Sequence, residues 1–126
     1  MKFISTRGGE CVSGAQAIVQ GIAKDGGLFV PEQFPQVSKE ELEKMLPQSY
    51  AERASFVLSK YLDEYDAAEL TKACEAAYAR FEGDDPAPLV KIDAGLYMLE
   101  LFHGPTCAFK DMALTLLPYL LRKGCD

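Results

Sequence analysis

The sequence predicts a mostly helical chain with short strands and one strand–turn–helix unit toward its C-terminal end. Helix starts are indicated where a Ser or Asp is followed three residues later by Glu, which is the spacing of a capping box. This spacing occurs at Ser38 with Glu41, Ser49 with Glu52 and Asp66 with Glu69. The strand–turn–helix unit is indicated by an apolar run, 96–102, followed by Gly104-Pro105 and a second apolar run from Met112.

The composition limits the class of protein. At 126 residues there is room for one domain with a real core, and 48% hydrophobic with 25% charged residues is ordinary for a soluble globular chain. The formal net charge of -6 argues against nucleic acid as a partner, because a polyanion repels an acidic surface. No apolar run is long enough to cross a bilayer, and residues 1–5 lack the pattern of a signal peptide. We therefore expect a cytoplasmic protein with no nucleic-acid and no membrane partner.

The N-terminal elements follow from periodicity and turn residues. Residues 2–6 are expected to form an opening strand, and the helical spacing of apolar residues predicts a helix over 15–23. That helix is expected to end at Gly26-Gly27, because glycine can take the left-handed conformation that closes a helix. Residues 28–30 then form a short strand before a proline.

Two of the three capped helices carry apolar stripes. The first of these stripes consists of Tyr50, Ala54, Val57, Leu58 and Tyr61, and the second of Leu70, Ala73, Cys74, Ala77, Tyr78 and Phe81. Stripes of this kind predict helix faces that pack in the core. A ligand groove lined by the same side chains is the alternative.

The clearest internal boundary is the loop 82–88, which contains two prolines, a glycine and three acids. Strands are expected after it at 89–92 and 96–102. The second of these is apolar on both faces, with only Glu100 breaking the run. Such strands belong to sheets that helices cover on both sides, yet the chain has few other strands to build one.

The final predicted helix, 112–121, is apolar nearly all round and is expected to need burial on every side. Pro118 either kinks this helix near Leu114 or ends it around Leu117. A single strand–turn–helix unit cannot close its own core, so the chain reads as the N-terminal fragment of a longer protein. We expect it to self-associate or to have a mobile C-terminal third. A complete small helical domain centred on this helix is the alternative.

The four cysteines, Cys11, Cys74, Cys107 and Cys125, are widely separated along the chain, which has one histidine. This pattern does not suggest a zinc site, so we expect free thiols and no bound metal. Cys107 is expected to pack as a small hydrophobe rather than to act as a nucleophile, because no charged partner is evident near it.

Lys110 is the leading candidate for chemistry. It lies after the apolar strand and a Gly-Pro turn, in the first turn of the predicted helix. A helix N-terminus carries partial positive charge, which disfavours an ammonium group and favours the neutral amine. A neutral amine is what Schiff-base formation requires, for example with a pyridoxal cofactor. A surface lysine that points into solvent is the alternative.

Polar neighbours supply further candidates. His103 either exchanges a proton or contacts a cofactor ring, or it caps the strand through a backbone hydrogen bond. Thr106 is expected to cap the lysine helix, with its hydroxyl accepting an early N–H. Asp111 is well placed for the helix dipole. Arg7 is a candidate either for phosphate binding or for an ion pair at the surface or between domains.

The run His103-Gly104-Pro105-Thr106-Cys107-Ala108-Phe109-Lys110-Asp111 resembles the pyridoxal-lysine segment of the threonine synthase family. Two other runs, Ser5-Thr6-Arg7-Gly8 and Asp25-Gly26-Gly27-Leu28-Phe29-Val30-Pro31, resemble the opening of the same family. The three runs lie in the family's order, and the resemblance covers essentially the whole chain. Cys107 departs from it, since the family more often has an aliphatic residue at that place.

The resemblance implies an α/β parent enzyme of the tryptophan-synthase-β-like fold type II class, with pyridoxal 5′-phosphate as its cofactor. Residues 1–83 would be its mostly helical N-terminal module, and residues 89–126 the truncated start of its cofactor-binding domain. The family converts O-phospho-L-homoserine and water into L-threonine and phosphate. Lys110 would bind the cofactor as a Schiff base and then move protons among the substrate carbons. His103, Thr106 and Asp111 would support it.

The same resemblance implies that parts are missing. Family members are several times longer, and their Gly-rich phosphate-binding loop lies downstream of the lysine helix. Neither Gly8-Gly9 nor Gly26-Gly27 stands between a strand and a helix as such a loop must. We therefore expect the chain to need the C-terminal part of the same protein and to be inactive alone. The alternatives are a threonine-synthase-like phospho-lyase and a non-catalytic module that docks on a partner through its apolar C-terminal helix.

Overall fold

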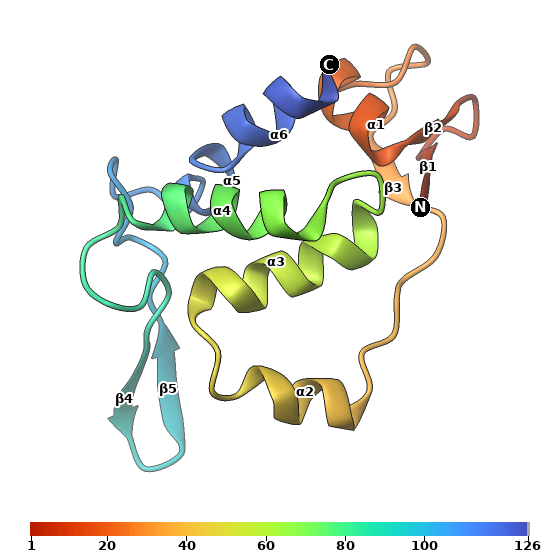
Figure 1. Cartoon of the computed structure of the whole chain (residues 1–126). Coiled ribbons are helices and arrows are strands. Elements are labelled where there is room, and N and C mark those ends of the chain that lie inside the picture. Colours follow the sequence, from red (N-terminus) through yellow and green to blue (C-terminus); the bar gives the residue numbers. More distant parts are fainter. Residues whose placement is uncertain (126) are drawn as a thin grey trace.

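Helices make up most of the regular structure in the computed structural model, which describes residues 1–125 (Figure 1). In chain order the elements are β1 (Lys2–Ser5), β2 (Cys11–Ser13), α1 (Gly14–Gln20), β3 (Phe29–Pro31), α2 (Lys39–Met45), α3 (Tyr50–Tyr61), α4 (Ala67–Tyr78), β4 (Leu89–Asp93), β5 (Leu96–Leu99), α5 (Asp111–Leu114) and α6 (Leu117–Gly124). The expected mixture of helices with short strands is confirmed. Asp126 lies outside the described residues.

The N-terminal strands form a three-stranded antiparallel sheet in the order β2–β1–β3. Ile4 in the central strand lies opposite Cys11 on one side and Val30 on the other. The sequence does not predict β2, because three residues are too few to show a periodic pattern.

α1 ends earlier than the sequence predicts. Its last residue is Gln20, and Gly21 follows with a φ of 76°. The expected end at Gly26-Gly27 is wrong because the chain between these points turns back on itself, with Ile22 and Leu28 paired in an antiparallel bridge. Gly26 has a left-handed backbone, with a φ of 76°, but it lies in that turn and does not end a helix.

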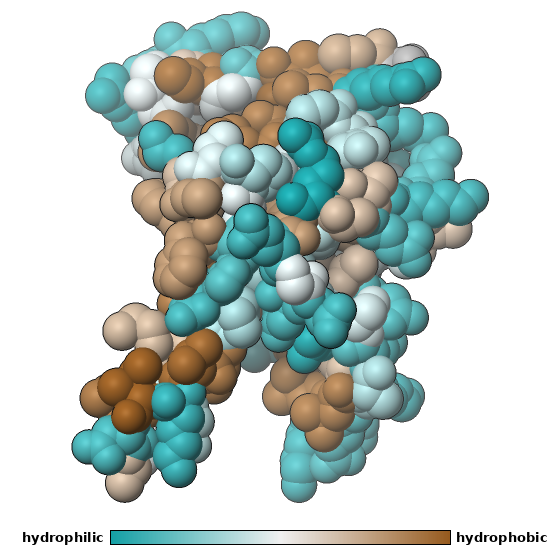
Figure 2. Space-filling model, turned by 90° about the vertical axis from the view of Figure 1, so that its left-hand side faces the viewer, coloured by the Kyte–Doolittle hydropathy of each residue, from teal (hydrophilic) through white to brown (hydrophobic). Residues whose placement is uncertain are grey.

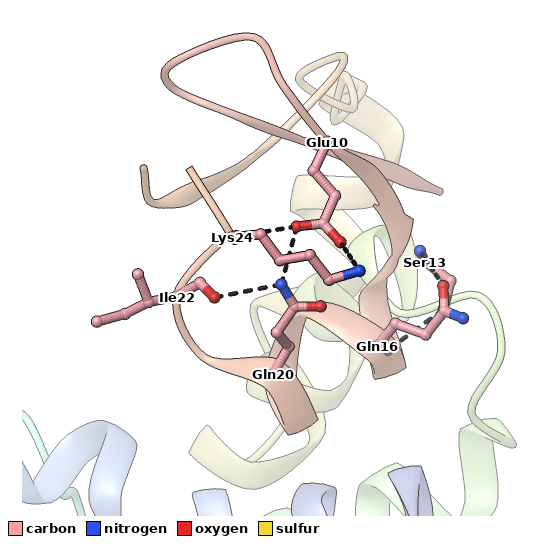
Figure 3. A network of polar contacts seen from close by, with 6 residues as sticks. All are labelled: Glu10, Ser13, Gln16, Gln20, Ile22 and Lys24. Atoms are coloured by element: carbon pink, nitrogen blue, oxygen red, sulfur yellow. Dashed lines mark hydrogen bonds and ion pairs between the residues drawn. The ribbon is translucent and has the colours of Figure 1, made fainter. Parts of the chain in front are cut away.

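The Glu10 carboxylate holds this turn beside the end of α1 (Figure 3). It accepts hydrogen bonds from the side-chain amide of Gln20 at 2.9 Å and from the backbone N–H of Lys24 at 3.1 Å. The Lys24 ammonium lies 3.5 Å from the other carboxylate oxygen. The Lys24 backbone hydrogen bond is the main cause that lowers the pKa of Glu10, so this carboxylate stays charged.

Side-chain caps fix where the helices start. The predicted reciprocal capping boxes are present at Ser38 with Glu41 and at Ser49 with Glu52. Asp66 caps α4 by accepting hydrogen bonds from two backbone N–H groups, but the Glu69 side chain points to Lys123, 3.2 Å away, instead of completing the box. A further box at the start of α1, formed by Ser13 and Gln16, is also drawn in Figure 3.

The core lies where α3, α4 and α6 meet. α3 and α4 run side by side, and α6 lies above α4 in this view and ends beside α1 (Figure 1). The buried apolar residues of this core are Ala51, Leu62, Tyr65, Leu70, Cys74, Ala77, Leu116 and Leu120. The α4 stripe is therefore core, as predicted, whereas Val57 of the α3 stripe stays 43% exposed.

β4 and β5 form an antiparallel hairpin that turns at Gly95, where φ is 74°. Every residue of both strands is exposed, and the hairpin forms the prong at the lower left of Figure 2, which carries a brown hydrophobic patch above a mostly hydrophilic tip. The expectation of a strand over 96–102 that is buried on both faces is wrong within the described residues. The strand ends at Leu99, and nothing in residues 1–125 covers its apolar faces.

The predicted helix over 112–121 is in fact two helices. α5 ends at Leu114 and α6 begins at Leu117, which places Pro118 in the first turn of α6. A proline costs no hydrogen bond there, because first-turn N–H groups have no partner within the helix. Leu120 is buried in the core while Tyr119 is 42% exposed, so the expected burial on every side is present on the core side only.

Candidate active site

Lys110 is the last residue of the loop between β5 and α5. Its backbone is helical, with φ -61° and ψ -24°, and it holds the N-cap position of α5. The sequence predicts Lys110 in the first turn of a helix, whereas in the structure it stands one residue before the first residue of α5, Asp111. Because α5 has four residues, the field at this end is that of a single helical turn.

Lys110 lines an apolar groove of about 520 Å³. The other lining residues are Tyr50, Leu101, Phe109, Met112, Ala113 and Leu114. Burial, helped by the nearby Asp85 carboxylate, raises the pKa of the Tyr50 phenol, so the groove presents a neutral hydroxyl. Within residues 1–125 the Lys110 amine has no hydrogen-bond or ion-pair partner. Lys110 is exposed and lines this groove, so its amine is accessible to a carbonyl compound that binds there.

Asp111 and Thr106 are joined directly beside Lys110. The buried Asp111 carboxylate accepts hydrogen bonds from the Thr106 backbone N–H and from the Thr106 hydroxyl, both at 2.7 Å. The expected role of Thr106 as the helix cap is wrong, because its hydroxyl donates to Asp111 and Lys110 occupies the N-cap position. These hydrogen bonds, that of the Thr106 hydroxyl first, lower the pKa of Asp111. Asp111 thus organises the loop, beyond the expected interaction with the helix dipole.

His103 lies at the start of the same loop. Its Nε2 atom is 2.7 Å from Oε2 of Glu100, and its ring stacks on Phe102 with centroids 4.6 Å apart. Its backbone oxygen accepts a hydrogen bond from the N–H of Glu82 at 2.9 Å. The ring therefore faces Glu100 instead of the Lys110 groove, and the backbone of His103 ties the loop to the end of α4.

Two contacts around the loop are not indicated by the sequence. The Tyr78 hydroxyl donates a hydrogen bond to the backbone oxygen of Met112 at 3.2 Å. Gly104 lies against Asp111, where an added Cβ would be 2.4 Å from the Asp111 Cβ. Tyr78 carries no signal beyond its place in an apolar stripe. The sequence marks Gly104 only as part of a Gly-Pro turn.

A second polar cluster joins the two N-terminal runs, 5–8 and 25–31. The Ser5 hydroxyl lies 2.7 Å and 2.9 Å from the two carboxylate oxygens of Asp25, and the Arg7 guanidinium donates to the Asp25 backbone oxygen at 2.9 Å. The Ser5 hydrogen bond is the main cause that lowers the pKa of Asp25. The Arg7 side chain is therefore engaged within the fold.

Other candidate functions find little support in residues 1–125. Among them no group of three or more His, Cys, Asp or Glu side chains is arranged to hold a metal ion. No helix in this part of the chain is long and apolar enough to cross a membrane. All four cysteines are free, and Cys107 is exposed with a φ of 57°, so the expectation that it packs in the interior is wrong.

Known proteins resemble this chain over nearly its whole length. A family model described as "Threonine synthase N terminus" matches residues 2–78. Threonine synthase of Schizosaccharomyces pombe is 42% identical over 120 residues, which are 93% of this chain and 23% of that protein. Threonine synthase of Methylobacillus glycogenes is 41% identical over 127 residues, 93% of this chain and 27% of that protein. The chain thus spans about a quarter of the length of these relatives.

Solved structures agree in fold as well as in sequence. The crystal structure of a PLP-bound threonine synthase from Brucella melitensis superimposes with a TM-score of 0.93 at 40% identity, covering 98% of this chain and 27% of that one. Threonine synthase from Escherichia coli superimposes with a TM-score of 0.89 at 35% identity, covering 99% of this chain and 28% of that one. The expected fold, that of the N-terminal part of a fold type II pyridoxal-phosphate enzyme, is confirmed. The chain belongs to the threonine synthase family and corresponds to its N-terminal region.

Proposed function

We propose that this chain is the N-terminal part of a pyridoxal-phosphate-dependent lyase that converts O-phospho-L-homoserine and water into L-threonine and phosphate. Lys110 is the residue that binds the cofactor. The observation that carries the proposal is the position of Lys110, which lines an apolar groove and has no ionic partner among residues 1–125. The family membership and the resemblance to a PLP-bound threonine synthase support it.

The residues around the groove fit a flat aromatic cofactor. Pyridoxal phosphate supplies an electron sink for carbanion chemistry when it is bound. Lys110 offers the amine to which its carbonyl carbon attaches, and the apolar side chains of Leu101 and Met112 limit the access of water. The same Lys110 amine would move protons between substrate carbons at its Nζ atom.

The exposed apolar surface supports a requirement for further chain. Leu89, Leu96, Met98 and Leu99 of the hairpin are each more than half exposed, at 64%, 56%, 54% and 54%. In this proposal the C-terminal part of the full-length protein covers them, residues 89–126 begin the cofactor-binding domain, and residues 1–83 form the helical module before it. The isolated chain is inactive because that C-terminal part also supplies the phosphate-binding loop. The four free cysteines accord with a cytoplasmic location, where thiols stay reduced.

Two alternatives make different predictions at the same lysine. A threonine-synthase-like phospho-lyase uses Lys110 but releases phosphate without forming threonine. This alternative is supported by the similarity to Threonine synthase-like 1 of Mus musculus, which is 39% identical over 120 residues. A non-catalytic interaction module does not need Lys110 at all, and its docking surface would be the hairpin, since α6 buries Leu120 in the core.

A hybrid chain tests the proposal. Residues 1–126 replace the matching N-terminal segment of the Methylobacillus glycogenes relative, and phosphate release and threonine formation from O-phospho-L-homoserine are measured. Lys110→Ala is expected to abolish both products. Lys44→Ala, which removes an exposed lysine on α2, is the matched control and is expected to leave both unchanged.

Each outcome of the hybrid assay separates the candidates. Both products, lost only in the Lys110 variant, support threonine synthesis. Phosphate without threonine assigns the phospho-lyase reaction. Full activity in Lys110→Ala would exclude Lys110 as the cofactor lysine, and a hybrid chain that forms neither product would favour the interaction module.

A further inference from the structure

One buried carboxylate closes the loop that carries Lys110. Asp111 follows the lysine directly and is 5% exposed. Its Oδ2 atom accepts a hydrogen bond from the backbone N–H of Thr106 and its Oδ1 atom accepts one from the Thr106 hydroxyl, each at 2.7 Å. Hydrogen bonds to an ionised carboxylate are among the stronger ones in proteins. The residue next to the lysine is thereby fixed to a residue at the start of the same loop.

Gly104 packs tightly against the Asp111 side chain inside this loop. An added Cβ on Gly104 would lie 2.4 Å from the Cβ and 2.6 Å from the Oδ2 atom of Asp111. Between them, Cys107 has a φ of 57°, and its N–H donates to the Gly104 backbone oxygen at 3.0 Å. A left-handed backbone at a residue other than glycine costs free energy and persists only where its surroundings hold it. The contacts of Asp111 and Gly104 are the surroundings that hold it here.

The backbone of Asp111 extends this hold toward the core. Its carbonyl oxygen accepts hydrogen bonds from the hydroxyl and the N–H of Thr115, at 2.7 Å and 3.1 Å. Thr115 is itself buried, at 6% exposed. Lys110 therefore stands between a closed loop on one side and a helix start fixed to the interior on the other. Its Cα has little freedom to move relative to the groove.

We propose that Asp111 and Thr106 are positioning residues that hold Lys110 at the edge of its groove. Neither lines the groove, and both act through the backbone that presents the lysine. The inference rests on the proposed function, because a fixed lysine matters only if its amine must meet a bound carbonyl compound. It assigns the Thr106–Asp111 pair a role in reactivity in addition to its role in loop structure.

Thr106→Val is the informative change, because it removes the hydroxyl and keeps the shape and the backbone N–H. Thr106→Ser keeps the hydroxyl and is the matched control. A hydrogen bond contributes on the order of 1 kcal/mol, so amide exchange over 104–111 is expected to rise about fivefold in Thr106→Val and to stay unchanged in Thr106→Ser. Gly104→Ala, which pushes on Asp111 from the other side, should raise exchange over the same residues.

The second measurement reads the lysine itself. The chain is treated with pyridoxal phosphate and borohydride, and the ratio of modification at Lys110 to that at Lys44 is measured by peptide mass spectrometry. We expect a high ratio in the wild type and in Thr106→Ser, and a ratio about fivefold lower in Thr106→Val, as the loss of one hydrogen bond implies.

The two measurements together decide the inference. Faster exchange in Thr106→Val with an unchanged Lys110 ratio would overturn it, since the pair would then be structural only. Unchanged exchange would overturn it as well, because the hydroxyl would not hold the loop. A wild type with no preference for Lys110 would also overturn the inference, since the closed loop would then not present the lysine; the proposed function is decided separately by the hybrid chain.

Discussion

The hydroxyl of Tyr78 donates a hydrogen bond to the backbone oxygen of Met112, 3.2 Å away. Tyr78 ends α4, and Met112 lies in α5, two residues after Lys110. Tyr78 also packs edge-on against Tyr50, which lines the lysine groove, with ring centroids 4.9 Å apart. The helical module is thus connected to the lysine segment through one side chain that the sequence marks only as apolar.

Removing this connection should cost stability. Tyr78→Phe keeps the ring and leaves the Met112 oxygen without its donor, so we expect the free energy of unfolding to fall by about 1 kcal/mol. Desolvation raises the pKa of Tyr78, so the phenol stays protonated and the loss should not vary across neutral pH. Urea titration checks this. Tyr97→Phe, in the exposed hairpin, is the control and should change nothing measurable; an equal loss in both variants would refute the role of the hydrogen bond.

Acid should weaken the N-terminal cluster in a defined direction. The Ser5 hydroxyl, followed by the Gly27 N–H, holds the folded pKa of Asp25 below its ordinary value. A group with a depressed folded pKa stabilises the fold fully above its unfolded pKa, about 4, and this stabilisation is lost as the pH falls through the folded pKa. Asp25→Asn should therefore lower the urea midpoint at pH 7 and flatten its decline below about pH 4.

The control for the acid experiment removes the same charge elsewhere. Asp84 lies in the exposed loop 82–88, and its carboxylate makes no hydrogen bond within residues 1–125, so Asp84→Asn is the control. It should leave the decline of the urea midpoint with acid as in the wild type. A decline in Asp25→Asn that is as steep as in the wild type would show that the Ser5–Asp25 pair contributes nothing to acid sensitivity.

The cysteines should divide into two classes toward a thiol reagent. Burial raises the pKa of the Cys74 thiol to about 11, and its side chain is inaccessible, so it should react only when the chain unfolds. Cys11, Cys107 and Cys125 are exposed and should react in the folded chain. Counting thiols with an aromatic disulfide reagent, with and without urea, checks this. Rapid reaction of Cys74 without urea would mean that the core of α4 opens readily.

The hairpin should drive self-association of the isolated chain. Its apolar residues are exposed on both faces, and Met98→Lys places a charge in the middle of β5. Sedimentation velocity should show oligomers in the wild type and a monomer in Met98→Lys. Leu46→Lys changes a leucine outside the hairpin that is even more exposed than Met98, and it should not dissociate the oligomers. A wild-type chain that stays monomeric at high concentration would contradict this expectation.

Local signals in the sequence predict the helices well. Capping pairs such as Ser49 with Glu52 fix a helix start through two hydrogen bonds within four residues, so no distant contact is needed to infer them. The end of α1 is different, because Gly21 and Gly26 are equally able to take a left-handed conformation and the antiparallel bridge at Ile22 decides between them. Tertiary pairing of this kind is not visible in local spacing.

The candidate site divides in the same way. Lys110 is found from its place after an apolar run and a Gly-Pro turn, and the structure puts it at an apolar groove. The sequence names Thr106 and Asp111 as supporting residues, but it does not reveal the hydrogen bonds between them or the one from Tyr78 to Met112, because these contacts depend on how the loop folds. The hairpin differs in that its apolar sequence predicts burial, whereas the strand is exposed because residues 1–125 contain no segment that covers it.

Borohydride reduction of the hybrid chain with bound pyridoxal phosphate, followed by peptide mapping, tests the central claim most directly. The account predicts that the reduced cofactor is found on Lys110 and that Lys110→Ala yields no such adduct while Lys44→Ala yields it unchanged. An active hybrid chain with the cofactor attached to any other lysine would contradict it.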